Sequence, residues 1–481
     1  MKSYPKLLFA VALNFIFSGF TFSQQITGGG SHSLVICSDS TGRSWGANYS
    51  GQLGNGTTNS TTTPVSVSTI SGLVAVASGW EHALALRNDS TVWAWGENMY
   101  GQLGDSSNFD SDTPVKVKVI DSIISISSGH IHTHSLAAKS DGSAWAWGYN
   151  SNGKLGDNTT TNRNFPARVH GPGNVGFLSG IIAVAGGHDF SLALKNDGTA
   201  WGWGANSFGQ LGDSSNTTTY TPRKVTILSG ARSIAVGDWH CIALKNDSTA
   251  WTWGYGGSGR LGDNSNLSKN APVMVHGPND VGFLTGIIAI AAGETFCLAL
   301  KYDGTVWSWG KNDLGQLGDN STTDRWTPVQ VAGPGGAGFL SGIISIGAGA
   351  RHAMALRNDG TLFTWGDNGS GQLGDGSYFT STTPVQVNGL CAMPTSAEEN
   401  ISSAGISVFP NPTTGIFYLS TGDEINPGSS FAIYNLCGQI VYRSEINKKE
   451  IEIDLSALAK GFYLFRVQNG GIIIIKYMVL Q

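Results

Sequence analysis

A histidine that closes a short recurring motif is the first candidate for chemistry in this chain. Gly-x-x-His, or a longer form of it, ends in Phe190 and Phe296 in two copies and in histidine in five others, His32, His82, His134, His240 and His352. A phenyl ring cannot replace a catalytic imidazole. The position therefore predicts packing or hydrogen bonding at a strand end. The sequence also contains no His-Glu-x-x-His, Gly-x-Ser-x-Gly, Cys-x-x-Cys or P-loop motif.

A small group of histidines could ligate a metal. His130 and His132 lie two residues apart, as ligands on a strand do, and His188 precedes Asp189. Imidazole and carboxylate ligands suit zinc. A lone cluster of this kind is more often incidental, so we predict no metal and no other cofactor. Aspartates also end each of six Gly-x-Leu-Gly-Asp loops, where we expect them to cap turns rather than bind calcium.

All of these residues belong to a unit that recurs along the chain. The pair Trp-Gly returns at intervals of 50 to 56 residues, each time followed by Gly-x-Leu-Gly and then by a proline; its tryptophans are Trp45, Trp95, Trp147, Trp203, Trp253, Trp309 and Trp365. Seven copies in one register predict seven similar structural units.

Within one unit the pattern is that of a β-hairpin. In residues 191–204, apolar residues alternate with small ones, Asn-Asp-Gly turns the chain, and Trp201 and Trp203 then lie on one face of the returning strand. A unit of about 53 residues with several short strands fits a four-stranded propeller blade. A β-solenoid is the alternative, although its rungs are usually shorter.

Composition restricts the class of protein. The chain has 481 residues, 67 glycines and only 13% charged residues, which is typical of a turn-rich β protein. A net charge of −5 argues against a nucleic-acid partner. Five scattered cysteines predict no disulfide framework. Cys241 and Cys297 share a repeat position with serines and alanines, so we expect both to be small buried residues.

The repeated motifs resemble the regulator of chromosome condensation repeat. The resemblance rests on Gly-x-x-His, Ser-Leu-Ala-Leu, Asn-Asp-Gly, Trp-x-Trp-Gly-x-Asn and Gly-Gln-Leu-Gly, and it covers residues 24–390. It implies an all-β chain with a seven-bladed β-propeller. Nuclear members of that family catalyse guanine-nucleotide exchange, and others inhibit β-lactamases. The second role shows that the scaffold can present a protein-binding face in bacteria.

Residues that differ between the copies are the candidates for ligand binding, because the scaffold does not dictate them. In a closed ring, the loops that carry them crowd one rim. We predict a ligand-binding rim for a protein or glycan that contains Trp80, Glu81, Tyr149, His188, Asp189, Asp238, Trp239, Tyr255 and Arg351. A solvated rim without a partner is an equally good interpretation.

The repeat pattern stops before the C-terminus. Residues 391–404 are small and polar and predict a linker, and residues 405–481 contain six or seven short strands that predict a small, immunoglobulin-like β-sandwich. This segment resembles the type A C-terminal sorting domain of the Bacteroidetes type IX secretion system. The motif residues that carry the resemblance include Pro410, Asn411, Pro412, Gly415, Gly461, Tyr463 and Lys476.

The resemblance implies that the type IX machinery is a partner of this segment. It further implies transport across the outer membrane, removal of the segment, and release or attachment at the cell surface. Three Asp-Ser-Thr turns, at Asp39, Asp89 and Asp247, resemble the O-glycosylation acceptor pattern of exported Bacteroidetes proteins. A tolerated turn substitution explains them equally well.

The N-terminus has the features of a signal peptide. Lys2 and Lys6 precede a largely apolar stretch at residues 7–20, and small residues follow up to Ser23. We therefore assign residues 1–23 to a signal peptide, and we predict no membrane span because the stretch is too short.

These observations together predict an exported binding module, secreted or held at the outer cell surface, rather than an enzyme. A structural or adhesive surface component is one alternative. An enzyme with a site in the central funnel is another, which the lack of paired acid and base residues disfavours.

Overall fold

The computed structural model describes residues 25–129, 134–392, 406–409, 415–421, 429–435, 440–456, 458, 461–469 and 472–480. These residues form two compact units, one before and one after the segment 393–405. The predicted signal peptide at residues 1–23 and most of the predicted linker lie outside the described residues, and both stay predictions. No helix in the described part of the chain is long and apolar enough to cross a membrane.

The larger unit is a seven-bladed β-propeller, as the repeats predict. In the described residues each blade is a four-stranded antiparallel sheet of consecutive strands. The first blade consists of β1 (Ile26–Gly28), β2 (His32–Ile36), β3 (Gly42–Gly46) and β4 (Thr61–Ser66), and the second of β5 (Leu73–Ser78), β6 (His82–Arg87), β7 (Val92–Gly96) and β8 (Ser111–Lys116). The third blade consists of β9 (Ile123–Ser128), β10 (His134–Lys139), β11 (Ala144–Gly148) and β12 (Arg163–Arg168). The fourth consists of β13 (Ile181–Gly186), β14 (Phe190–Lys195), β15 (Ala200–Gly204) and β16 (Thr219–Lys224).

The remaining three blades follow the same order. The fifth blade consists of β17 (Ala231–Val236), β18 (His240–Lys245), β19 (Ala250–Gly254) and β20 (Lys269–Met274). The sixth consists of β21 (Ile287–Ala292), β22 (Phe296–Lys301), β23 (Val306–Gly310) and β24 (Arg325–Gln330). The seventh consists of β25 (Ile343–Ala348), β26 (His352–Arg357), β27 (Leu362–Gly366) and β28 (Ser381–Gln386). In the described part of the chain, four short 3-10 turns lie in the connections, η2 (Pro172–Asn174), η3 (Gly257–Gly259), η4 (Pro278–Asp280) and η5 (Pro334–Gly336).

The second tryptophan of each repeat holds neighbouring blades together. Trp203 on β15 is fully buried, whereas Trp201, two residues earlier, is half-buried. The Trp203 indole donates a hydrogen bond of 2.8 Å to the main-chain oxygen of Lys154 in the preceding blade. The other six repeat tryptophans donate in the same way, to the main-chain oxygens of Gln372, Gln52, Gln102, Gln210, Arg260 and Gln316.

The glycines of Gly-x-Leu-Gly allow this contact. Gly212 adopts φ +67°, and a Cβ atom there would lie 2.8 Å from the Trp253 indole nitrogen. Only glycine fits a left-handed backbone this close to a buried ring. The repetition of the motif therefore follows from blade packing.

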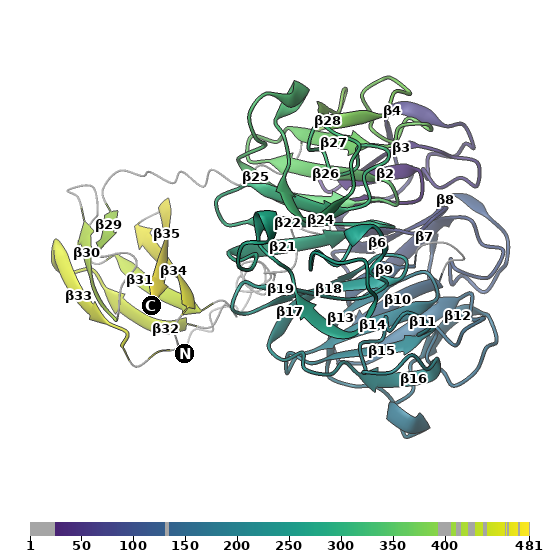
Figure 1. The fold of residues 1–481 in the computed structure, drawn as a ribbon, viewed down its shortest axis with the longest axis horizontal. Helices are drawn as coiled ribbons and strands as arrows, with labels where there is room; N and C mark the ends of the chain where they lie inside the picture. The colour runs from purple at the N-terminus through teal and green to yellow at the C-terminus, as the bar shows by residue number, and fades with distance from the viewer. Residues whose placement is uncertain are drawn as a thin grey trace, which may run out of the picture. The chain divides into compact units, whose positions relative to one another are not determined.

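The ring closes between the first and the seventh blade. Strand β1 packs against β5 on one side and against β25 on the other, and Figure 1 shows the purple first blade beside the green seventh blade. Trp45 and Val35 pack with Met354 and Leu356 across this boundary. No described strand is exchanged between the two blades, so side-chain contacts carry the closure.

One disulfide bond reinforces this closure and corrects the expectation from the cysteine spacing. Cys37, which follows β2, is bonded to Cys391, which follows β28, and the two cysteines are 354 positions apart in sequence. The next residue along, Ala392, accepts a main-chain hydrogen bond from Ser38. Cys391 is thus attached to the first blade, although the composition of its surroundings predicts a linker. Cys241 and Cys297 are free and buried, as predicted.

The C-terminal unit contains two small antiparallel sheets in its described residues. One consists of β29 (Ile406–Phe409), β30 (Ile416–Thr421) and β33 (Glu450–Asp454), and the other of β32 (Ile440–Glu445), β31 (Ser430–Asn435), β34 (Gly461–Asn469) and β35 (Ile472–Leu480). Phe417 and Ile453 of the first sheet share one apolar core with Phe431 and Val467 of the second. The immunoglobulin-like topology of the predicted sandwich stays a prediction.

Candidate functional site

Two loops of every blade lie at the same edge of the propeller, which we call the rim. In an antiparallel blade the end of the first strand and the end of the third strand meet at one edge. The structure connects these loops directly: the amide of the residue after Trp-Gly donates to the main-chain oxygen of the residue immediately before the histidine in Gly-x-x-His. Tyr255 N bonds Trp239 O at 2.8 Å, and Glu97 N bonds Glu81 O at 2.8 Å.

Main-chain hydrogen bonds also join the rim loops of successive blades. His188 N bonds Asp238 O, Asp238 N bonds Glu294 O, and Glu294 N bonds Ala350 O, at 2.9 to 3.3 Å. Ala350 N then bonds Gly29 O, which crosses from the seventh blade to the first. From the fourth blade through the seventh to the first, the variable residues therefore stand on a collar of hydrogen-bonded loops rather than on separate loops.

The recurring histidines lie beneath this collar, fully buried. Four of them bond through Nε2 to a side chain of the next blade: His82 to Ser135 at 2.9 Å, His134 to Ser191, His240 to Cys297, and His352 to Ser33. His32 has no such partner among the described residues, because Ala83 occupies the corresponding place in the second blade. Their role in the structure is packing and hydrogen bonding between blades.

Burial of these imidazoles makes the propeller sensitive to acid. Burial and the nearby His352 lower the pKa of His32 to about 3, and burial lowers the pKa of His352 to about 4. The unfolded chain binds these protons near pH 6.5, so stability is complete above that pH and falls as the pH drops towards 4. We expect a loss of about 1.4 kcal/mol per pH unit for each such histidine.

A single substitution checks this expectation. His32→Phe copies the Phe296–Ala353 pair of the last two blades, so it should fold and should make stability less dependent on pH between 6.5 and 4. Urea unfolding at several pH values measures the effect. An unchanged pH dependence in this variant would show that His32 is not neutral in the folded protein.

On the third and fourth blades, the rim carries a buried ion pair under aromatic rings. Lys154 is fully buried, and its Nζ lies 2.7 Å from Asp189 and 2.9 Å from the main-chain oxygen of His188. The Tyr149 ring covers the same ammonium at 4.6 Å, and Tyr100 packs on Tyr149 with ring centroids 4.5 Å apart. Burial works to raise the pKa of Asp189, but the His188 hydrogen bond and the Lys154 charge outweigh it and lower that pKa.

The aromatic contacts continue onto the fifth blade. His188, whose Nδ1 lies 2.9 Å from Asp189, stacks on Trp239 with ring centroids 4.4 Å apart. The rings of Phe208 and Trp239 meet edge to face with centroids 5.7 Å apart, and the rings of Phe208 and Tyr255 have centroids 4.7 Å apart. The guanidinium of Arg260 lies 4.6 Å from the Tyr255 ring. We call this continuous set the aromatic row, which consists of Tyr100, Tyr149, Lys154, Asp189, His188, Trp239, Phe208, Tyr255 and Arg260.

Further acids and a cation adjoin the row. Asp238 is 4% exposed, and burial together with the neighbouring Glu294 raises its pKa well above the usual range. Arg351 donates from Nε to Glu294 at 2.9 Å. Trp80 and Glu81 lie on the second blade, where Trp80 covers Gly30 of the first blade and Glu81 accepts a hydrogen bond from Ser50 at 2.8 Å. No ring contact joins Trp80 to the row among the described residues.

Comparison with known families identifies the propeller. Residues 121–407 match the model of the RCC1-like domain, and residues 44–86 and 89–136 match the regulator of chromosome condensation (RCC1) repeat. The chain belongs to the RCC1-like domain family. Residues 407–481 match the secretion system C-terminal sorting domain, which supports secretion by the type IX system to the cell surface or the exterior.

Relatives of this RCC1-like propeller occur in proteins of several kinds. The human E3 ubiquitin-protein ligase HERC2 is 31% identical over 53% of this chain and 5% of its own length, and the Arabidopsis thaliana ultraviolet-B receptor UVR8 is 28% identical over 60% and 62%. The chain thus spans less than two thirds of either relative. The crystal structure of human WBSCR16 is similar with a TM-score of 0.59 and 26% identity, covering 69% of this chain and 87% of that one.

Four residues of the aromatic row were missed in the sequence. Tyr100 and Phe208 lie in variable loops, whereas Lys154 and Arg260 also carried a signal. They stand where the other five Gly-x-Leu-Gly motifs have glutamine. Each lies beneath a tyrosine that follows Trp-Gly, so the two departures from the repeat occur together.

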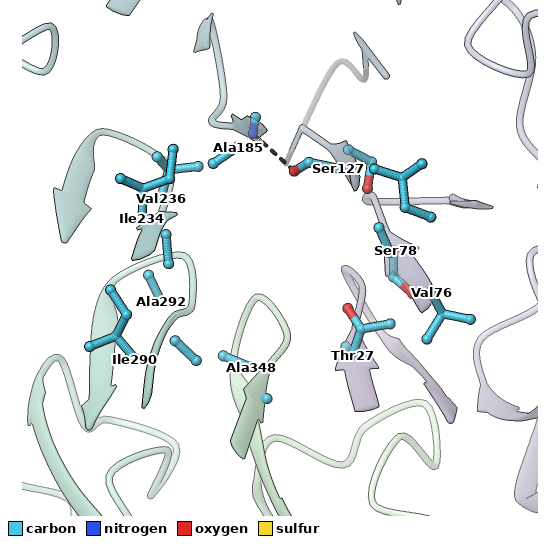
Figure 2. Close-up of a pocket in the computed structure, with 18 of the residues that line it drawn as sticks. Thr27, Val76, Ser78, Ser127, Ala185, Ile234, Val236, Ile290, Ala292 and Ala348 are labelled. Atoms are coloured by element: carbon cyan, nitrogen blue, oxygen red, sulfur yellow. Dashed lines mark hydrogen bonds between the residues drawn. The ribbon is translucent and has the colours of Figure 1, made fainter. Parts of the chain in front are cut away.

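The first strands of the RCC1-like blades surround a central cavity of about 180 Å³. Figure 2 shows Thr27, Ser78, Ser127, Ile234 and Ala348 around it, with a hydrogen bond of 3.1 Å between Gly186 N and Ser127 Oγ. Its lining in the described residues is apolar apart from serines and one threonine, without an ionisable side chain. The lining therefore offers no acid and base pair at this place.

The structure describes only some of the residues predicted as metal ligands or as parts of the sorting motifs. His130 and His132 lie outside the described residues, and His188 is engaged by Asp189 and Trp239. The described residues hold no group of three or more metal-ligating side chains. Pro410, Asn411 and Pro412 are also outside the described residues, whereas Gly415 precedes β30, Gly461 and Tyr463 are on β34, and Lys476 is on β35.

Proposed function

We propose that this exported RCC1-like propeller is a binding module, and that the aromatic row on its rim binds a protein or glycan ligand. The observation that carries the proposal is the continuous contact of non-repeating aromatic and charged residues across four blades. Large aromatic residues anchor most binding faces, because they bury much area with few rotatable bonds. The alternative of a purely structural surface component does not require such a row.

The buried lysine supports binding because it does nothing that the scaffold needs. Glutamine fills the same position in five repeats, and burying an ammonium group costs several kcal/mol before its partners compensate. In return, Lys154 fixes Asp189 and the loop of His188 in one arrangement beneath Tyr149. A face that is rigid before the ligand arrives loses less entropy on binding.

Two acids of the rim are engaged by cations, which favours binding over catalysis at these residues. Asp189 is paired with Lys154, and Glu294 with Arg351. A general acid or base needs a proton that it can exchange near neutral pH, and the lowered pKa of Asp189 keeps that carboxylate ionised.

Capture by the immobilised full chain tests the proposal. We expect Trp239→Ala to weaken retention of a ligand from culture medium or a glycan array by at least about thirtyfold, which is the loss of a central anchor. Trp80→Ala, outside the row, should have a smaller effect. Phe177→Ala, on the opposite edge and 49% exposed, is the control. Loss of binding in the control with retention in Trp239→Ala would refute the proposal.

A further inference from the structure

The first strand of the first blade is shorter than its counterparts. In the other six blades the first strand has six residues, whereas β1 has three in the described part of the chain. The pairing register is nevertheless the same. Val76 pairs with Ala85 in the second blade, and Ile26 pairs with Val35, each 50 positions earlier. β1 therefore corresponds to the second half of a complete first strand.

A recurrent hydrogen bond marks where the chain enters a complete first strand. In the second blade, the amide of Asn88 in the hairpin after β6 donates to the main-chain oxygen of Gly72, just before β5. We call this residue and the two before it the strand entry, which is residues 70–72 in the second blade. The five blades that follow contain the same bond, from Ser140, Asn196, Asn246, Tyr302 and Asn358 to Ser122, Gly180, Gly230, Gly286 and Gly342.

In the first blade, the strand entry is supplied by the other end of the propeller. Ser38, at the same hairpin position, donates to the main-chain oxygen of Ala392 at 2.8 Å. Leu390 and Cys391, the two residues before it, pack against the apolar cluster that contains Ile26. Residues 390–392 thus take the place that, in the six other blades, belongs to the residues directly connected to the first strand.

The spacing of the repeats assigns the same place to a second segment. Counting 50 positions back from residues 70–72 leads to residues 20–22, near the end of the predicted signal peptide. Phe20 supplies an apolar residue at the position of Ile70 and Leu390. A directly connected segment closes no long loop, whereas residues 390–392 close one of more than 350 residues, at a cost in chain entropy. The connected segment therefore has the advantage while it is present.

We propose that the signal peptide delays closure of the propeller, because its last residues compete with residues 390–392 for the strand entry of the first blade. Its removal leaves the place to residues 390–392. A disulfide oxidant then takes up the two electrons and two protons that the thiols of Cys37 and Cys391 lose, and the bond fixes the closed ring. Signal-peptide removal and disulfide formation both belong to export into an oxidising compartment. The inference is independent of what the rim binds.

Oxidative refolding of the full chain with and without residues 1–23 tests this proposal. Both chains are refolded from urea in reduced and oxidised glutathione, and alkylation followed by peptide mapping measures the loss of the Cys37 and Cys391 thiols. We expect the disulfide to form at least about tenfold more slowly with the signal peptide attached, because a long loop must then displace a connected segment. Equal rates in the two chains would overturn the proposal.

The matched control carries the same signal peptide, separated from Gln24 by a flexible Gly-Ser spacer. The spacer keeps the apolar residues of the signal peptide but moves them out of register with β1. This chain should therefore form the disulfide as fast as the chain that lacks residues 1–23. Equally slow formation in both chains that carry the signal peptide would show that apolarity alone delays folding, and the shared strand entry would then be wrong.

Cleavage after refolding gives a second readout. A purified signal peptidase is added to the refolded chain that carries the signal peptide, with glutathione still present. Removal of residues 1–23 should start formation of the Cys37–Cys391 bond and raise the melting temperature to that of the chain refolded without them. Complete removal with no gain in the disulfide would contradict the proposal.

Discussion

Breaking the disulfide between the first and last blades should lower the stability of the propeller more than any substitution on its surface. Cys37→Ser with Cys391→Ser frees a loop of more than 350 residues. A chain-entropy account gives about 6 kcal/mol for such a loop, and removal of a native disulfide typically costs about 2–5 kcal/mol. The unfolding entropy grows with the number of ordered residues, here roughly 370, so a loss of about 4 kcal/mol in the free energy of unfolding lowers the melting temperature by about 5 °C. Thermal unfolding by circular dichroism measures it.

The melting temperatures of the natural protein and the double variant in a reducing agent provide a second measurement. Reduction of the natural protein should reproduce the melting temperature of the double variant and should leave that variant unchanged. Cys297→Ser is the control, since serine already partners a histidine at this position in Ser135 and Ser191. Equal melting temperatures with and without the disulfide would show that side-chain contacts alone close the ring.

Removing one of the repeat tryptophans should be as damaging as opening the ring. Trp203→Ala leaves a large cavity between the third and fourth blades and deprives the Lys154 main-chain oxygen of the indole hydrogen bond. Substitutions of this kind cost about 3–5 kcal/mol, a large share of the 5–15 kcal/mol that stabilises a typical domain. Urea unfolding monitored by circular dichroism measures the loss.

Trp201→Ala tests whether position rather than residue type decides the result. Trp201 lies two residues earlier on the same strand, is half-buried, and is covered by Lys195 at 5.7 Å. We expect it to cost about a third as much as Trp203→Ala. A comparable loss from both variants would contradict the assignment of the second tryptophan as the inter-blade contact.

The sequence was sufficient for the propeller because the packing of blades is local and repeated. Each blade needs the same buried tryptophan, the same glycine beside it and a histidine or phenylalanine ring beneath the rim, so the pattern returns seven times. The closure is different, since Cys37 and Cys391 meet once and no other copy of the repeat has a cysteine at the position of Cys37. Their pairing depends on the ring being closed, which spacing along the chain does not reveal.

The rim was predictable in position but not in its contacts. Antiparallel blades bring two loops to one edge, so the repeat pattern alone places Tyr149, Trp239 and Tyr255 on a common rim. The stacking of His188 on Trp239 joins residues of two blades, and no single repeat encodes it. The Lys154–Asp189 pair also crosses blades, although the exchange of glutamine for lysine marked one of its members.

Hydrogen exchange of the full chain with its captured ligand tests the binding face most directly. Mass spectrometry should show slower exchange in the loops of the aromatic row, residues 149–156, 187–190, 205–211, 237–240 and 255–262, when the retained protein or oligosaccharide is present. The hairpins at the opposite edge, such as residues 195–200, should exchange as before. Protection confined to those hairpins, with none at the row, would contradict the account.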